Sequence, residues 1–285
     1  MINWTRKRVR GNQKEYAIGE LITHGDLADL YRCTIVRDGD PAIFKVAREI
    51  SVNDLLINEA RILNLIIGKM PQIDPYLPSF IDSFTVHSTE GDFQVNVFLS
   101  QEGWYSLKEV KQNYPNGVSP RHAAWMFRKI LMPIGLAHRE GVLHGAVLPP
   151  HILVNPALHG VQLIGWSASV LKPARTGERL DIMPIEYVNW YPPETYDHDG
   201  PKQSVDITMA ARCMVYVLGG NPLSAEIPVN PEFEDPWVYE KFQTFLAGTI
   251  LPEIVAPKDA WRLRTEFTQM IDAIWRPEFV PFQMP

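Results

Sequence analysis

The strongest constraint on the fold is a change in periodicity at Glu102–Gly103. Before this point, residues 16–102 carry short alternating or apolar segments of the kind that form β-strands, together with one helical segment. After it, residues 103–285 carry long segments with helical spacing and only two short apolar runs. The sequence therefore predicts an α+β protein with a β-rich first half and a mainly helical second half.

In the first half, several elements can be placed. We expect a strand, a turn and a strand over 16–36, a strand over 42–47, a helix over 51–69 and a hairpin over 79–101. Gly25 and Asp26 belong to the first turn. Either Ser51 or Asn53 is expected to cap the helix, and Gly68 to end it.

The second half begins its helical pattern at Ser119, which is expected to cap a long helix over 119–143 with Pro120 at its first position and Gly141 just past its end. Two short apolar runs predict a small hairpin. Further helices are expected over 204–220, which is apolar nearly all round and therefore central, and over 257–275.

Composition excludes several classes of protein. A net charge of −6 argues against nucleic-acid binding, and no apolar run approaches the roughly 18 residues that a membrane span needs. Residues 1–15 are basic but lack the apolar core of a signal peptide, so we expect a solvated tail. Cys33 and Cys213 favour a reduced, cytoplasmic compartment, although the two could still pair.

Six short motifs follow one another in an order that resembles the protein-kinase fold over about residues 16–280, with a β-rich N-lobe over 16–102 and a helical C-lobe over 103–285. By this resemblance, Lys45 is the strand lysine that contacts nucleotide phosphates and Glu59 is its helix partner. Gly25 alone remains of the glycine-rich loop. Ile43 replaces the small residue that usually covers the adenine, so nucleotide binding is weakened.

By the same resemblance, the catalytic loop keeps its structural residues but not its catalytic ones. In "LHGAVLPPHILVN", His144 keeps the structural histidine, while Gly145 replaces the usual Arg, Ala146 the catalytic Asp and His151 the metal-binding Asn. In "LIGWS", Gly165 replaces the metal-binding Asp. The motifs resemble those of bacterial pseudokinases related to Hanks-type serine/threonine kinases.

Two structural slots are also recognisable. Glu194 in "YPPE" resembles the acid that usually pairs with an Arg before the final helix. That Arg falls at Ala256, so the bridge is absent or is made by Lys258 or Arg262. Asp206 resembles the central-helix aspartate that tethers the catalytic loop.

The resemblance implies a bilobal protein without ordinary kinase activity, metal site or certain cofactor. The leading hypothesis is a pseudokinase that acts as a scaffold or regulator through a protein partner that the sequence does not name. The alternatives are a nucleotide sensor that binds ATP without normal magnesium coordination and an atypical phosphotransferase that uses the same cleft.

Some residues could support the enzyme alternative. His151 or His144 would serve as an unconventional base, and Asp181 or Glu186 as a substitute metal ligand. Thr176 would be a phosphorylation site. For each of these residues, packing or a solvated loop is the simpler interpretation. Trp190, Trp261 and Trp275 are expected to pack rather than to bind a ligand.

Overall fold

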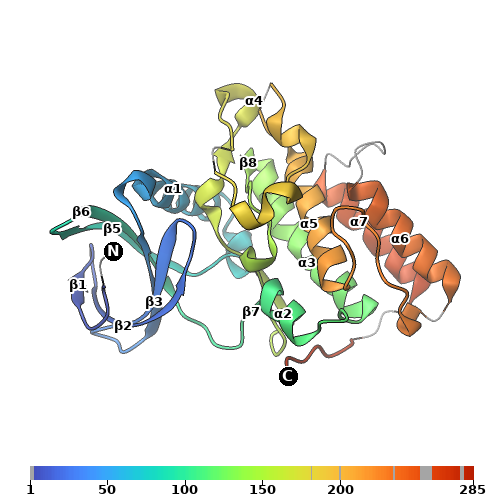
Figure 1. The fold of residues 1–285 in the computed structure, drawn as a ribbon, viewed down its shortest axis with the longest axis horizontal. Coiled ribbons are helices and arrows are strands. Elements are labelled where there is room, and N and C mark those ends of the chain that lie inside the picture. Colours follow the sequence, from blue (N-terminus) through green and yellow to red (C-terminus); the bar gives the residue numbers. More distant parts are fainter. Residues whose placement is uncertain (1–2, 181, 199, 234, 251–258, 277–278) are drawn as a thin grey trace. The chain divides into compact units, whose positions relative to one another are not determined.

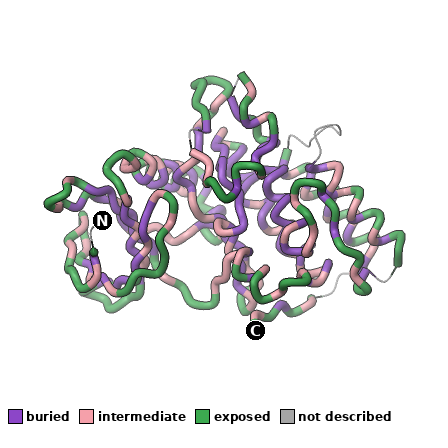
Figure 2. The backbone as a smooth tube through the Cα atoms, viewed as in Figure 1, coloured by how far each residue is buried: buried purple, intermediate pink, exposed green. Residues whose placement is uncertain are grey.

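A computed structural model describes residues 3–285 except 181, 199, 234, 251–258 and 277–278. The chain divides into two compact units, one made of Met1–Asp74 with Pro78–Glu102 and the other of Pro75–Leu77 with Gly103–Pro285. Figure 1 shows the elements of each unit and Figure 2 maps burial along the backbone.

The N-terminal unit is built on one antiparallel sheet in the order β1-β2-β3-β4-β6-β5. Its elements are β1 (Arg8–Arg10), β2 (Glu15–His24), β3 (Ala28–Ile35), β4 (Pro41–Ala47), α1 (Asn53–Lys69), β5 (Phe80–Ser88) and β6 (Gly91–Leu99). In the register of β4 with β6, Lys45 lies opposite Asn96. This register decides which side chains the strand lysine can reach.

The solvated tail predicted for residues 1–15 is wrong. Residues 8–10 form β1 and pair with β2, and Trp4 is only 5% exposed. The indole of Trp4 packs against Phe44 and Phe93, with ring centroids 6.2 and 6.3 Å apart. Burial of an apolar side chain of this size stabilises the fold by more than solvation of the neighbouring basic residues would stabilise a free tail.

The predicted caps of α1 are also wrong. Neither Ser51 nor Asn53 caps the helix, whose N-cap position is Val52. The amide of Asn53 instead joins α1 to β6, since it donates to the carbonyl of Asp92 at 2.9 Å and accepts from the N–H of Gln94 at 2.8 Å. The helix continues through Gly68 and ends at Lys69.

The C-terminal unit is mainly helical. Its helices are α2 (Leu107–Asn113), α3 (Pro120–Arg139), α4 (Pro173–Thr176), α5 (Gln203–Val217), α6 (Pro236–Ile250) and α7 (Ala260–Ile274). Its strands are β7 (Tyr105–Ser106), β8 (Val142–Leu143), β9 (Ile152–Asn155), β10 (Gly160–Leu163) and β11 (Val170–Leu171). Helix α3 packs against both α5 and α7, and 13 of the 15 residues of α5 are buried.

Several predictions for this unit are confirmed. Ser119 caps α3 by accepting from the N–H of Arg121, Pro120 is the first helical residue, and Gly141 follows the helix with φ of 76°. The β9–β10 hairpin is present. Helices α2 and α6 were not predicted, and α6 is rich in aromatic and β-branched residues of modest helix propensity.

Short 3-10 helices connect these elements: η1 (Ile50–Val52), η2 (Pro71–Tyr76), η3 (Pro149–His151), η4 (Trp166–Ala168), η5 (Ile185–Trp190), η6 (Pro193–Tyr196) and η7 (Pro231–Phe233). Both cysteines are buried free thiols, Cys33 in the N-terminal unit and Cys213 in the C-terminal unit. Across the described part of the chain, we find no helix with the length and apolarity that crossing a membrane requires.

Candidate functional site

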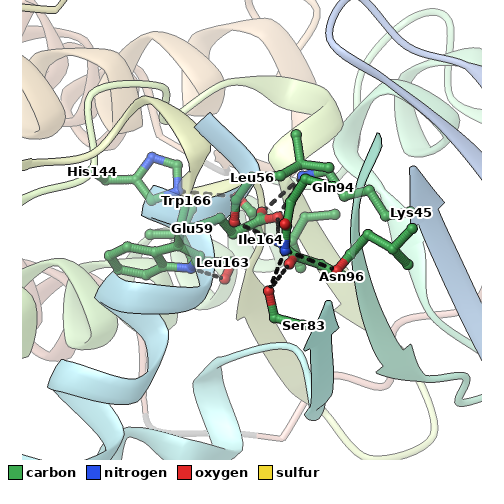
Figure 3. A network of polar contacts seen from close by, with 11 residues as sticks. Lys45, Leu56, Glu59, Ser83, Gln94, Asn96, His144, Leu163, Ile164 and Trp166 are labelled. Atoms are coloured by element: carbon green, nitrogen blue, oxygen red, sulfur yellow. Dashed lines mark hydrogen bonds and ion pairs between the residues drawn. The ribbon is translucent and has the colours of Figure 1, made fainter. Parts of the chain in front are cut away.

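The first part of the candidate site is an ion pair inside the N-terminal unit. The ammonium group of Lys45 on β4 donates to both carboxylate oxygens of Glu59 on α1, each at 2.8 Å (Figure 3). The side chains are 15% and 2% exposed. Because both side chains are largely removed from water, loss of either one would leave a buried polar group without its partner.

A polar network fixes the acidic partner of this pair. Asn96 on β6 is fully buried, and its amide donates to Glu59 Oε2 and to the carbonyl of Leu56, each at 2.9 Å. In turn, Ser83 donates to the amide oxygen of Asn96 at 2.8 Å, and Gln94 donates to the Ser83 hydroxyl at 2.7 Å (Figure 3). Sequence reasoning missed Asn96, whose only signal is a polar residue within an apolar strand.

The turn between β2 and β3 holds the remaining glycine of the predicted phosphate loop. The N–H of Gly25 donates to the carbonyl of Ala28 at 3.0 Å, and a Cβ at position 25 would lie 2.8 Å from that oxygen. The guanidinium of Arg48 donates to the carbonyl of Gly25 at 2.9 Å. Both backbone groups of Gly25 are therefore already bonded within the protein.

Charged side chains hold this turn from its flanks. Asp29 is 3% exposed and lies 2.8 Å from the Nδ1 atom of His24 and 3.5 Å from the Nε atom of Arg48. A phosphate that used the backbone N–H of Gly25 would have to displace the bond to Ala28. The turn is built to be held in place rather than to receive an anion.

The second part of the candidate site lies in the C-terminal unit, around Asp206 on α5. One carboxylate oxygen accepts from the backbone N–H of His144 and the other from that of Gly145, both at 2.8 Å. The His138 Nε2 atom lies 2.9 Å from Asp206. Burial alone would raise the pKa of Asp206, but these hydrogen bonds outweigh it and hold the pKa below its usual value.

His144 is a buried, neutral imidazole. Its Nε2 atom lies 3.0 Å from the carbonyl of Ile164, and its Nδ1 atom accepts from the N–H of Ala146 at 3.1 Å. Burial lowers its pKa to about 4, against the opposing effect of Asp206. The indole of Trp166 packs edge-on at 4.5 Å between centroids and donates to the carbonyl of Leu163 at 2.8 Å (Figure 3).

The ring of His151 lies beside Gly165, where a side chain at position 165 would be. Gly165 adopts a left-handed conformation with φ of 79°, and a Cβ there would lie 2.8 to 2.9 Å from three ring atoms of His151. The ring is held there because its Nδ1 atom lies 2.8 Å from the carbonyl of Ala146, which is itself buried. The imidazole therefore occupies the space that any side chain at position 165 would need.

Gly145 is constrained in the same way. Its φ is 75°, and a Cβ there would lie 2.4 Å from a methyl carbon of Leu180 and 2.9 Å from the carbonyl oxygen of Ala168. An L-residue at this position would be strained in its backbone and would clash with its neighbours. Positions 145 and 165 thus both hold glycine in a setting that suits no larger residue.

The segment after Gly165 contains the predicted substitute groups. The hydroxyl of Thr176 accepts from the N–H of Glu178 at 3.1 Å and so closes its own exposed turn. Glu186 is paired with Lys108 on α2, whose ammonium group lies 2.9 and 3.0 Å from its two oxygens. Asp181 lies outside the described residues.

Of the expected partners of Glu194, only Arg262 lies among the described residues, and it is paired elsewhere. Arg262 is paired with Glu266 at 2.8 Å, one turn further along α7, and its side chain is 80% exposed. Ala256 and Lys258 lie outside the described residues.

Electrostatics instead link Glu194 to Arg212 on α5. Arg212 is 7% exposed and donates to the carbonyl of Trp190. Burial lowers the pKa of Arg212, and the charge of Glu194 opposes that effect. Sequence reasoning missed this arginine because it lies on a helix with no apparent relation to the "YPPE" motif.

The three tryptophans singled out from the sequence pack against other side chains. Trp190 meets Tyr216 edge-on at 5.7 Å between centroids. The indole of Trp261 lies so close to α3 that a Cβ at Gly135 would be 2.9 Å from its nitrogen. Trp275 is 5% exposed.

No protein-family model matches this chain, and no curated protein matches it in sequence. Solved structures do match. The crystal structure of the BubR1 kinase domain aligns with a TM-score of 0.68 and 12% identity, over 94% of this chain and 84% of that one. The structure of vaccinia related kinase 3 aligns with a TM-score of 0.67 and 13% identity, over 96% of this chain and 92% of that one.

The chain has a protein-kinase-like fold. The predicted fold class is confirmed, with an antiparallel sheet and one long helix in the N-terminal unit and a helical C-terminal unit. The positions that the sequence motifs assign to the base and the metal ligands hold Ala146, His151 and Gly165. A methyl group and a hydrogen atom can neither accept a proton nor bind magnesium, and imidazole suits zinc or copper better than magnesium.

Among the described residues, no three His, Cys, Asp or Glu side chains come together in a way that could hold a metal ion. Phosphoryl transfer depends on metal ions to offset the charge of the transferred group. In the C-terminal unit, Asp206 holds the loop that contains His144 and Gly145 by two hydrogen bonds to its backbone.

Proposed function

We propose that this chain is a catalytically inactive kinase-like protein, a pseudokinase, that acts as a scaffold or regulator by binding a protein partner. The observation that carries the proposal is the imidazole of His151, which fills the space beside Gly165. A slot that was merely empty could still admit a ligand from a neighbouring segment. A slot filled by a hydrogen-bonded ring cannot do so without rearrangement.

The chemistry supports the same conclusion. Loss of a general base costs about 10²- to 10⁴-fold in rate. Ala146 offers no such base, and the Nδ1 atom of His151 is engaged with a backbone carbonyl. His144 is held as a buried neutral ring by bonds on both nitrogens.

The test is a phosphotransfer assay with radiolabelled ATP, with magnesium and with manganese, on the wild type and on Lys45→Ala. We expect no transfer to the chain itself or to a general acceptor such as casein above the background of Lys45→Ala. Transfer by the wild type that Lys45→Ala abolishes would overturn the proposal and would favour the atypical phosphotransferase. Lys14→Ala is the matched control, because Lys14 is also a lysine of the N-terminal unit but pairs with Asp38 at the surface.

A protein partner is supported by apolar side chains on the segment that follows Gly165. Ile185 is 90% exposed, Tyr196 is 58% exposed and Val188 is 44% exposed. Side chains of this kind bury area readily at an interface. In cells that express the chain, proximity labelling should yield a set of proteins that Ile185→Glu with Val188→Glu no longer recovers. An unchanged set would remove this surface from the proposal.

A second candidate function is nucleotide sensing, and the observation that favours it is the buried pair of Lys45 and Glu59. A thermal-shift titration with ATP, with and without magnesium, tests it. A ligand at 100 times its dissociation constant stabilises the folded state by about 2.7 kcal/mol, which is readily measured.

The informative variant is Lys45→Met combined with Glu59→Gln, since this pair leaves no uncompensated buried charge. An ATP-dependent shift that disappears in this variant and persists in Lys14→Ala would establish the sensor. If millimolar ATP does not raise the melting temperature of the wild type, the sensor is excluded and only the scaffold proposal remains.

A further inference from the structure

A cavity of about 390 Å³ lies within the C-terminal unit, and no residue of the loop that contains His144 lines it. It is lined by α3, by the end of α7, by the turn between β9 and β10, and by residues 279–280. The lining residues that matter here are Arg121, Trp125, Arg128, His159, Trp275 and Arg276. Its volume falls within the range of about 300–1,000 Å³ that is typical of small-molecule sites.

One wall of this cavity is aromatic. The imidazole of His159 lies flat on the indole of Trp125, with centroids 4.0 Å apart and planes within 10°, and meets Phe279 edge-on at 4.7 Å. His159 has a φ of 48°, a left-handed conformation that costs energy in a residue with a Cβ. The chain thus accepts backbone strain at the point where it completes a stacked wall.

The charge of the cavity is positive, whereas the whole chain carries −6. Three of its described lining residues are arginines, and Asp272 is the one acid among them. The carboxylate of Asp272 lies 3.8 Å from Arg128, at the outer limit of an ion pair. The Arg121 guanidinium lies over the ring of Trp275, 5.1 Å from its centroid.

Two residues that line the cavity have an indole N–H without an acceptor in the described part of the chain. The indole nitrogens of Trp125 and Trp275 are buried and donate to no acceptor within the described residues. A buried N–H without a partner costs roughly 1–3 kcal/mol, and native proteins leave few of them. The guanidinium groups of the lining arginines favour an acceptor that is negatively charged.

We propose that this cavity binds a small aryl anion, an aromatic ring that carries a carboxylate or phosphate group. The ring stacks on the wall formed by Trp125 and His159, and the anionic group is held by the guanidinium of Arg121 with those of Arg128 and Arg276. The site is independent of the proposed pseudokinase function, because none of its residues belongs to the degenerate slots.

The test measures binding of four probes to the full chain: phenyl phosphate, phenylacetate, inorganic phosphate and benzyl alcohol. Binding is followed by calorimetry and by tryptophan fluorescence. We expect saturable binding of one or both aryl anions, phenyl phosphate and phenylacetate. Their affinity should be at least about tenfold higher than that of benzyl alcohol, which has a ring and no charge, or of inorganic phosphate, which has charge and no ring. The tighter of the two aryl anions identifies the acid group. Equal binding of inorganic phosphate or benzyl alcohol would overturn the proposal, as would no binding of either aryl anion at millimolar concentration.

Variants place the binding in this cavity. Arg121→Gln should weaken the aryl anion about tenfold or more, because a hydrogen bond to a charged group is lost. Arg139→Gln is the matched control, since Arg139 also lies on α3 with its guanidinium over an indole, 4.7 Å from the ring of Trp261, but does not line the cavity. We expect the affinity of this control to equal that of the wild type.

Arg276→Gln provides a second variant at an exposed position, so that folding is not at risk. It too should weaken binding, and binding should fall with added salt. Unchanged affinity in both Arg121→Gln and Arg276→Gln would exclude this cavity as the site.

Discussion

The His151 ring lies where a side chain at position 165 would be, and this predicts the cost of Gly165→Ala. The left-handed backbone at φ of 79° costs an L-residue roughly 1–2 kcal/mol. The new methyl group would also lie 2.8 to 2.9 Å from three ring atoms of His151, where carbon atoms prefer about 3.5–4.0 Å. Overpacking of this kind costs about 1–3 kcal/mol. We therefore expect Gly165→Ala to lower the free energy of unfolding by about 2–5 kcal/mol.

A double-mutant cycle separates the two contributions. In a His151→Ala background the ring is gone, so Gly165→Ala should cost only the backbone strain of about 1–2 kcal/mol. The coupling between the two sites should then be about 1–3 kcal/mol. His151→Ala alone also loses the bond to the carbonyl of Ala146, and the cycle cancels that loss.

The assay is urea unfolding followed by tryptophan fluorescence, with Trp166 as a fully buried reporter beside His144. The matched control is Gly177→Ala. Gly177 also has a positive φ, of 71°, but no atom lies within 4 Å of its would-be Cβ, so it reports strain without a clash. If Gly165→Ala costs the same with and without His151, the ring does not fill the slot and the reasoning is refuted.

Three further predictions concern the two hydrogen-bond networks. Asn96→Leu should destabilise the N-terminal unit by about 1–3 kcal/mol in urea unfolding, because Glu59 loses a buried donor; no loss would show that the donor is dispensable. Asp206→Ala should cost about 3–5 kcal/mol and speed hydrogen exchange at residues 144 and 145, whose N–H groups lose their acceptor; unchanged exchange there would contradict the tether. The pKa of His144, about 4 when folded and about 6.5 when unfolded, means that the unfolded chain binds the proton first as pH falls. Stability from this residue is therefore complete above pH 6.5 and declines by about 3 kcal/mol down to pH 4, a decline that His144→Phe should remove from urea midpoints measured against pH; parallel pH profiles would contradict it.

The fold is predictable because its signals are local. Alternating segments, a Ser-Pro start at residues 119–120 and a glycine after the helix each specify an element from its own residues. The errors arose where tertiary contacts override local preference. Trp4 draws the basic N-terminal segment into the sheet, and Asn53 bonds to β6 instead of capping α1.

The candidate site is only partly predictable from sequence, since motif spacing gives positions and not contacts. Lys45 and Glu59 can be named from their motifs, but Asn96 is recognisable only once β4 and β6 are in register. The charge interaction between Arg212 on α5 and Glu194 on η6 connects two elements that no common motif links. Likewise, a glycine in place of an acid reads as a simple loss, and only the structure reveals the imidazole that takes its room.

The contacts of Asp206 separate the shape of the loop from its chemistry. Two of its bonds go to backbone N–H groups, at His144 and Gly145, which any residue except proline provides. The bond at position 144 therefore does not depend on which side chain that residue carries. A loop anchored through its backbone keeps its shape independently of the chemistry of the side chains around the anchor.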